Sequence, residues 1–119
     1  MAIEVEKKSH KSISESNFRP DMISIANALQ SQGILLDVRN AGELPKVVHK
    51  RCIQLSLAEL SENWKRLDLE KEICIFCKSG QRSIQAAELL NQLGFQKIKL
   101  IKGGANELVE QMNYEKDIS

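Results

Sequence analysis

Residues 73–82 read Ile-Cys-Ile-Phe-Cys-Lys-Ser-Gly-Gln-Arg. The first four are a short apolar run, which is typical of a strand buried on both faces of a parallel sheet. Cys77 follows the run directly, and a helical pattern begins at about Gln81. This order of strand, short loop and helix predicts an α/β fold with a thiol at the carboxyl end of a strand, the edge where open α/β sheets bind ligands.

The same alternation continues on both sides of this stretch. Short apolar runs indicate further strands at residues 34–36, 52–55 and 98–101. Apolar residues at helical spacing indicate helices at residues 56–64, 81–94 and 105–112. The sequence therefore predicts a small, mainly parallel sheet flanked by helices, in a domain of residues 13–112 with Ile13 in a short edge strand. Residues 1–12 are expected to form a flexible N-terminus and residues 113–119 a polar C-terminal tail.

A further helix is predicted between Pro20 and Gly33. Proline suits the first helical position, Asp21 is favourable in the first turn, and glycine suits the C-terminal end. One face is apolar by the i, i+3, i+4, i+7 rule, through Met22, Ile25, Ala26 and Leu29. Residues 40–50 have no clean period and are predicted to form a loop with at most one helical turn.

Two cap motifs mark the ends of predicted helices. Ser56 and Glu59 have the spacing of a capping box at a helix N-terminus. Gly94 can close the helix that begins near Gln81, with Phe95 packing back on Leu90 as in a Schellman motif.

Composition excludes several classes of function. The chain has 119 residues, of which 17 are Lys or Arg and 16 are Asp or Glu, so a net charge of +1 gives no reason to expect nucleic acid or an anionic membrane as a partner. Aromatic residues make up only 4%, which argues further against base stacking. Three cysteines do not make a disulfide framework, the first residues lack a secretory signal, and no segment has the apolar length of a membrane helix. A cytoplasmic protein is the expectation.

The loop after Cys77 has the composition that activates a thiol. Backbone N–H groups at the start of a helix can point inward as an anion-binding nest, and nearby cations add positive charge. Such surroundings lower the pKa of a cysteine from its reference of about 8.5 and favour the nucleophilic thiolate. The candidate cradle consists of Lys78, Ser79, Gly80, Gln81 and Arg82.

Other titratable residues are weaker candidates. Cys74 lies within an apolar run and Cys52 in a short strand, so a structural role is favoured for both. Neither His10 nor His49 has a metal-ligand spacing with the cysteines, so no metal is expected, although a Cys–His pair between Cys77 and His49 stays open. Asp37 and Arg39 lie at the end of a neighbouring strand and are expected to form a salt bridge or turn cap. The alternative is that both residues, together with His49, line the rim of a pocket at Cys77.

Four segments together carry a family resemblance. They read Leu-Leu-Asp-Val-Arg at residues 35–39, Cys-Lys-Ser-Gly-Gln-Arg-Ser at 77–83, Ala-Ala-Glu-Leu-Leu at 86–90 continuing to Leu-Gly-Phe at 93–95, and Ile-Lys-Gly-Gly at 101–104. In this order the chain resembles a single rhodanese domain, over nearly its whole length. The resemblance implies a parallel sheet between helices and a catalytic cysteine at Cys77.

The resemblance also implies an activity. In that family the cysteine thiolate takes a sulfane sulfur from a small donor such as thiosulfate, becomes a persulfide, and passes the sulfur to a thiophilic acceptor, which is cyanide, a small thiol or a protein. No metal or organic cofactor is implied. The alternative from another class is a non-enzymatic sulfur carrier or a regulatory binding module. Phosphatases and arsenate reductases of related architecture have five residues between the cysteine and the arginine, whereas this chain has four between Cys77 and Arg82, so that activity is less favoured.

The chain departs from the family pattern in one segment. Rhodanese domains commonly have Gly-His-Ile-Pro-Gly-Ala after the Asp-Val-Arg strand, and this chain has Val-Val-His-Lys-Arg-Cys at residues 47–52. The tryptophan that usually follows the double glycine is also replaced, near Leu108. Because the cysteine loop itself is intact, the departure bears on substrate preference more than on activity.

Overall fold

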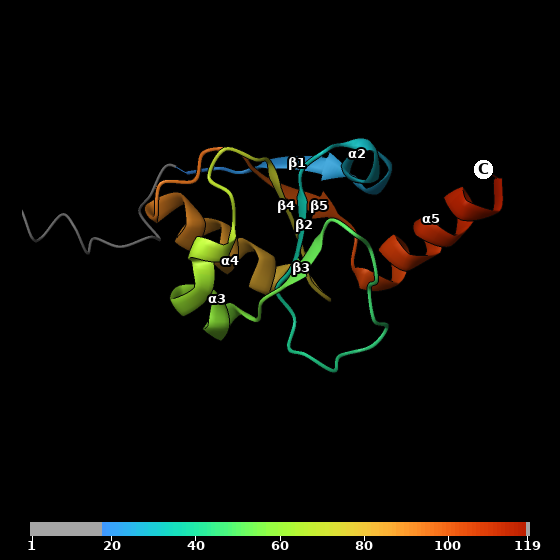
Figure 1. The fold of residues 1–119 in the computed structure, drawn as a ribbon, viewed down its shortest axis with the longest axis horizontal. Coiled ribbons are helices and arrows are strands. Elements are labelled where there is room, and N and C mark those ends of the chain that lie inside the picture. The colour runs from blue at the N-terminus through green and yellow to red at the C-terminus, as the bar shows by residue number, and fades with distance from the viewer. Residues whose placement is uncertain (1–17, 119) are drawn as a thin grey trace, which may run out of the picture.

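The computed structural model describes residues 18–118. Five strands form one sheet in the order β1-β5-β4-β2-β3, and every pairing between them is parallel (Figure 1). Their bounds are β1 Asp21–Ser24, β2 Ile34–Asp37, β3 Cys52–Gln54, β4 Ile73–Phe76 and β5 Ile98–Lys102. The predicted α/β fold with a mainly parallel sheet is confirmed. Ile13 and the predicted N-terminus lie outside the described residues.

Helices cover both faces of the sheet. One face carries α3 (Leu57–Asn63), the short 3₁₀ helix η2 (Trp64–Arg66) and α4 (Gln81–Gln92), and the other carries α2 (Ile25–Gln30) and α5 (Ala105–Ile118) (Figure 1). Each face has its own core because side chains alternate along a strand. The interior strands β2 and β4 are therefore buried along their whole length, and they are apolar except for Asp37 at the carboxyl end of β2.

Both predicted caps are present. The Ser56 hydroxyl accepts the Glu59 N–H while the Glu59 carboxylate accepts the Ser56 N–H, which completes a capping box at the start of α3. At the end of α4 the Phe95 N–H donates to the Leu90 carbonyl and the Gly94 N–H to the Asn91 carbonyl, the two bonds of a Schellman motif.

The prediction of one helix from Pro20 to Gly33 is wrong at both ends, because α2 spans only Ile25–Gln30 and its C-cap is Ser31 and not Gly33. Residues 21–24 form the edge strand β1, which pairs with β5, and Met22, a residue of the predicted apolar face, is 50% exposed. The helix begins only after Ser24, whose hydroxyl accepts the Asn27 N–H as the N-cap. Pairing with the exposed side of β5 outweighs the local helical pattern in this segment.

The C-terminal end differs from the expected bounds. The last helix, α5, continues to Ile118, so residues 113–118 of the predicted tail are helical. Residues 40–50 form a loop as predicted, with turns and bends and no helical turn. Among the helices of residues 18–118, none combines the length and the apolar character needed to cross a bilayer.

Candidate active site

Cys77 lies at the carboxyl edge of the sheet, directly after β4. Its side chain is buried in the core on the α3/α4 side, and the residue is only 1% exposed. The loop that follows brings the N-terminus of the 12-residue helix α4 next to the sulfur. Unpaired N–H groups and the positive end of the helix dipole therefore face the thiol.

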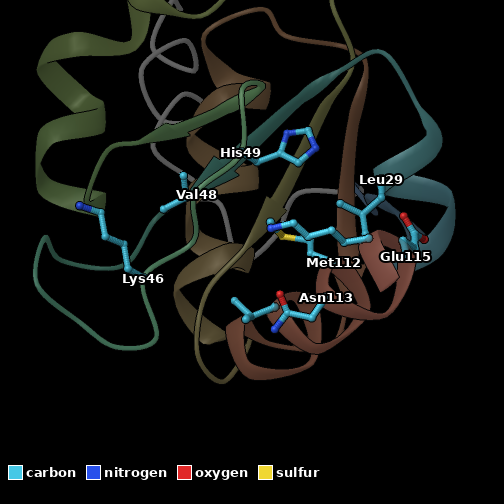
Figure 2. A pocket seen from close by; sticks show the side chains of 9 residues that line it. Leu29, Lys46, Val48, His49, Met112, Asn113 and Glu115 are labelled. Carbon is cyan, nitrogen blue, oxygen red and sulfur yellow. The ribbon is translucent and has the colours of Figure 1, made fainter. Parts of the chain in front are cut away.

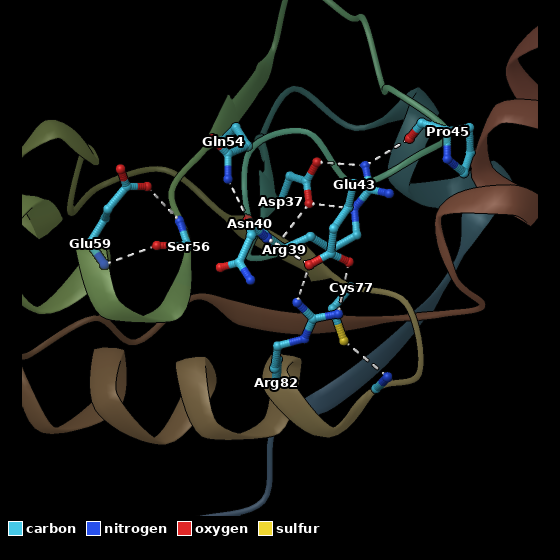
Figure 3. A network of polar contacts seen from close by, with 11 residues as sticks. Asp37, Arg39, Asn40, Glu43, Pro45, Gln54, Ser56, Glu59, Cys77 and Arg82 are labelled. Atoms are coloured by element: carbon cyan, nitrogen blue, oxygen red, sulfur yellow. Dashed lines mark hydrogen bonds and ion pairs between the residues drawn. The ribbon is translucent and has the colours of Figure 1, made fainter.

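The sulfur is surrounded by hydrogen-bond donors. The Gly80 N–H donates to Cys77 Sγ at 3.0 Å (Figure 3). Burial alone would raise the pKa of this thiol, but hydrogen bonds from the Ser83 hydroxyl and from the backbone N–H groups of Gly80, Ser83 and Ser79 outweigh it and lower the pKa. The geometry therefore favours a thiolate despite the burial.

Two glycines give the loop its shape. Gly80 has a φ of 98°, a left-handed conformation that places its N–H on the sulfur and that other residues rarely adopt. Gly104, between β5 and α5, packs against the backbone of the cysteine loop, where an added Cβ would lie 2.6 Å from the Lys78 carbonyl oxygen. The double glycine therefore lets two loops meet beside Cys77.

Cys77 differs from the other two cysteines in its electrostatics. All three thiols are free. Burial, with Asp37 nearby, raises the pKa of Cys52 to about 12, and burial, with Glu72 nearby, raises that of Cys74 to about 11. Only Cys77 has a lowered pKa, so it is the nucleophile that the surroundings select.

We expect Ser83→Ala to raise the pKa of Cys77, because burial then acts against fewer hydrogen bonds. The pH dependence of alkylation by iodoacetamide measures this, since the rate follows the thiolate fraction, and the curve should move to higher pH. Ser79→Ala is the matched control, because Ser79 acts through its backbone N–H, which alanine retains. Equal shifts in the two variants would contradict the assignment to the Ser83 hydroxyl.

The side chains that were candidates for the cradle differ in their exposure and in their partners. Lys78, Ser79 and Gln81 are exposed, and Ser79 helps to lower the pKa of Cys77 through its backbone N–H. The guanidinium of Arg82 forms a bidentate ion pair with Glu43, at 2.6 Å and 3.1 Å (Figure 3). The cradle at Cys77 is therefore built mainly from N–H groups and the Ser83 hydroxyl.

Asp37 and Arg39 form the expected salt bridge. Two bonds of 2.9 Å join the guanidinium to the carboxylate, and the Arg39 N–H also donates to Asp37. The guanidinium lies 5.9 Å from the centre of the Phe76 ring and donates to the Pro45 carbonyl. Both residues are buried, yet they also line a cavity of about 330 Å³ beside Glu43. The pair thus fixes the loop that carries Glu43 to the end of β2.

His49 lies away from Cys77. It precedes β3, whereas Cys77 follows β4, and because these strands run in the same direction the two residues are at opposite edges of the sheet. His49 instead lines a cavity of about 640 Å³, with Leu29 of α2 and Met112 of α5 (Figure 2). The structure therefore does not place His49 on a rim beside Cys77 and gives no Cys–His pair. Within residues 18–118, His, Cys, Asp and Glu side chains form no cluster of three suited to a metal ion.

Two residues of this site were not identified from the sequence. Ser83 could have been found, because a hydroxyl in the first turn of a helix after a cysteine loop lies within reach of the sulfur. Glu43 gave no signal, because it is separated from its partner Arg82 by 39 positions and lies in a loop without a clear pattern.

Comparisons with known proteins agree with this architecture. The model of the rhodanese-like domain family matches residues 22–111. A rhodanese-related protein from Thermoplasma volcanium has 32% sequence identity and a TM-score of 0.65, over 76% of this chain and 92% of that protein.

Two curated relatives come from Bacillus subtilis (strain 168). The putative sulfurtransferase YtwF is 29% identical over 70 residues, which are 59% of this chain and 67% of that protein. The putative sulfur carrier protein YrkF is 34% identical over 64 residues, which are 54% of this chain and only 35% of that longer protein. The chain belongs to the rhodanese-like domain family, and its relatives are named for sulfur transfer and sulfur carriage.

Proposed function

We propose that this protein is a sulfurtransferase that moves a sulfane sulfur from a donor such as thiosulfate, through a persulfide on Cys77, to a thiophilic acceptor. The acceptor is cyanide, a small thiol or a protein thiol. The observation that carries the proposal is the environment of Cys77, whose sulfur is buried among N–H donors and whose pKa alone among the cysteines is lowered.

The chemistry takes two steps. The Cys77 thiolate attacks the outer sulfur of thiosulfate, the sulfur–sulfur bond of the donor breaks, and sulfite leaves with the bonding electrons. The acceptor nucleophile then attacks the outer sulfur of the persulfide, and the Cys77 thiolate is regenerated. Both steps leave a negative charge at the loop, either on the cysteine sulfur or on the outer persulfide sulfur.

The loop is suited to holding that charge. The N–H groups of Ser79, Gly80 and Ser83 and the Ser83 hydroxyl are fixed before the reaction, so they stabilise the anion without reorganising. These donors belong to the protein backbone and one side chain, and the chemistry needs no metal or organic cofactor.

We place the reaction in a reducing compartment, the cytoplasm, because all three thiols are free.

A sulfur carrier is the second candidate, and the similarity to a relative named a putative sulfur carrier protein favours it. Steady-state assays separate the two functions. With thiosulfate or cysteine persulfide in excess and cyanide as acceptor, a sulfurtransferase is expected to form many equivalents of thiocyanate per protein. A protein that takes up one sulfur per chain from the donor but forms no thiocyanate above the uncatalysed rate would be a carrier and would contradict the enzyme. We expect neither phosphatase nor arsenate reductase turnover.

A further inference from the structure

The cavity at His49 lies on the α2/α5 side of the sheet, and the chemistry proposed for Cys77 makes no use of it. Its volume of about 640 Å³ is in the range of small-molecule sites. Three parts of the chain line it: the end of α2, the second half of α5 and the loop before β3 (Figure 2). The cavity is therefore formed by the tertiary fold, as small-molecule sites usually are.

The segment that departs from the family pattern, residues 47–52, holds two walls of this cavity together. Within it, His49 lines the cavity, and the Arg51 backbone N–H donates to His49 Nδ1 at 3.1 Å. The guanidinium of Arg51 reaches the end of α2, where it donates to the Leu29 carbonyl at 2.8 Å and to the Ala28 carbonyl at 3.2 Å. Because one arginine binds both the loop and the helix, the cavity is already formed before any ligand arrives.

His49 supplies a hydrogen-bond donor at the cavity. Burial and the charges of Arg51 and Lys50 lower its pKa, so the ring is neutral at neutral pH. Because Nδ1 accepts the Arg51 N–H, the proton of the neutral ring is on Nε2. Among residues 18–118 no group accepts a hydrogen bond from Nε2, and the Lys46 ammonium at the same wall forms no ion pair. Two donors on this wall are therefore available to an acceptor.

The helical walls of the cavity are apolar. Leu29 of α2 and both Val109 and Met112 of α5 line it, and all three are half-buried. Val48 on the loop lines it as well and is 72% exposed. A ligand that covers these side chains removes apolar surface from water, which is the main source of affinity for an organic molecule.

The charges around the cavity favour an anion. Of the charged residues that line it, Lys46 and Lys116 are basic and Glu115 is acidic. The Glu115 carboxylate already accepts a hydrogen bond of 3.1 Å from the Gln111 side chain, one turn earlier on α5. Figure 2 shows Glu115 on the side of the cavity away from Lys46. The loop wall is therefore the end at which a negative group is stabilised.

We propose that this cavity binds amphipathic organic acids. The apolar part of the ligand lies against Leu29 and Met112, and its carboxylate accepts the His49 Nε2–H and pairs with Lys46. Binding is non-covalent, and it does not depend on the reaction at Cys77, which lies at the opposite edge of the sheet.

The test uses octanoate as the probe and octylammonium as its cationic counterpart of equal chain length. The backbone amide signals of the ¹⁵N-labelled full chain are followed by NMR during titration at pH 7.5. Octanoate is expected to shift the amides of Leu29, His49 and Met112 with a common dissociation constant of about 1 mM, and octylammonium to bind about fivefold more weakly.

Three variants assign the binding to the cavity. Met112→Gln replaces apolar surface of the helical wall and is expected to weaken octanoate binding about tenfold. Lys46→Gln removes the partner charge and is expected to weaken it about threefold. Lys65→Gln changes the net charge equally, but Lys65 is exposed on η2 at the other face of the sheet, so its dissociation constant should equal that of the wild type.

The shifted amides and the variants together decide the outcome. Because Lys46 also lines the cavity beside Glu43, shifts confined to Asn40 and Gln54 of that cavity would overturn the proposal. Equal affinity for octanoate and octylammonium, or shifts that do not saturate at about ten times the expected dissociation constant, would overturn it as well. If Met112→Gln does not give a native thermal unfolding curve, an unchanged affinity in Lys46→Gln is sufficient to reject the carboxylate site.

Discussion

Cys77→Ser is expected to reduce sulfur transfer to the background rate without unfolding the protein. A serine hydroxyl can occupy the same buried position and accept the Gly80 N–H, so the loop keeps its shape. It cannot form a persulfide, and its pKa is far too high for it to ionise beside the same N–H groups. Thiocyanate formation from thiosulfate and from cysteine persulfide is the measurement, with circular dichroism as the check on folding.

Cys52→Ala provides the matched comparison. Cys52 is half-buried at the edge strand β3, and burial raises its pKa to about 12, so it is not a thiolate at neutral pH. We expect this variant to retain transfer. Turnover that survived in Cys77→Ser and disappeared in Cys52→Ala would move the nucleophile to β3 and contradict the assignment.

Arg39→Met is expected to cause the largest loss of stability among substitutions at the site, about 3–5 kcal/mol in the free energy of unfolding. The substitution leaves the Asp37 carboxylate buried without its charged partner, and it also removes the hydrogen bond to the Pro45 carbonyl. The stacking of the guanidinium on Phe76 is lost as well. Chemical denaturation at equilibrium measures the effect.

A second variant separates the buried charge from packing. Asp37→Leu combined with Arg39→Met removes both charges, and apolar pairs often replace buried ion pairs with little net cost. We expect the double variant to recover much of the stability lost by Arg39→Met alone. If the single substitution costs less than about 1 kcal/mol, the carboxylate is not held in a low-dielectric site and this explanation of the pair is wrong.

Most of the fold could be predicted because its signals are local. The strands β2, β4 and β5 are apolar runs, and the Schellman motif at Gly94 and the capping box at Ser56 depend on residues close in sequence. The edge strand β1 could not be found in this way. Its residues fit a helical stripe, and only pairing with β5, whose partner residues are more than 70 positions away, makes them extended.

The same difference between local signals and distant partners applies to the residues of the site. The position of Cys77 and the turn at Gly80 follow from one short stretch of sequence, and the structure agrees with both. The ion pair of Arg82 with Glu43 depends on the path of the loop after β2, which has no periodic pattern. That same path carries His49 to the amino end of β3, so a residue that looked like a candidate near the pocket lies at the opposite edge of the sheet. Side-chain partners across a fold are set by topology, which local patterns do not contain.

Cys77 is the residue on which the transferred sulfur is expected to be held. The wild-type protein can be loaded with cysteine persulfide, freed of excess donor, alkylated and digested, and its three cysteine peptides examined by mass spectrometry. We predict the mass of one added sulfur atom on the peptide that contains Cys77, and its removal by a thiol reductant. Cleavage between Cys74 and Cys77 places these two cysteines on separate peptides. We predict no added sulfur on the peptide that contains Cys74 or on the peptide that contains Cys52. Sulfur found on Cys52 or Cys74, with Cys77 unmodified, would contradict the central claim.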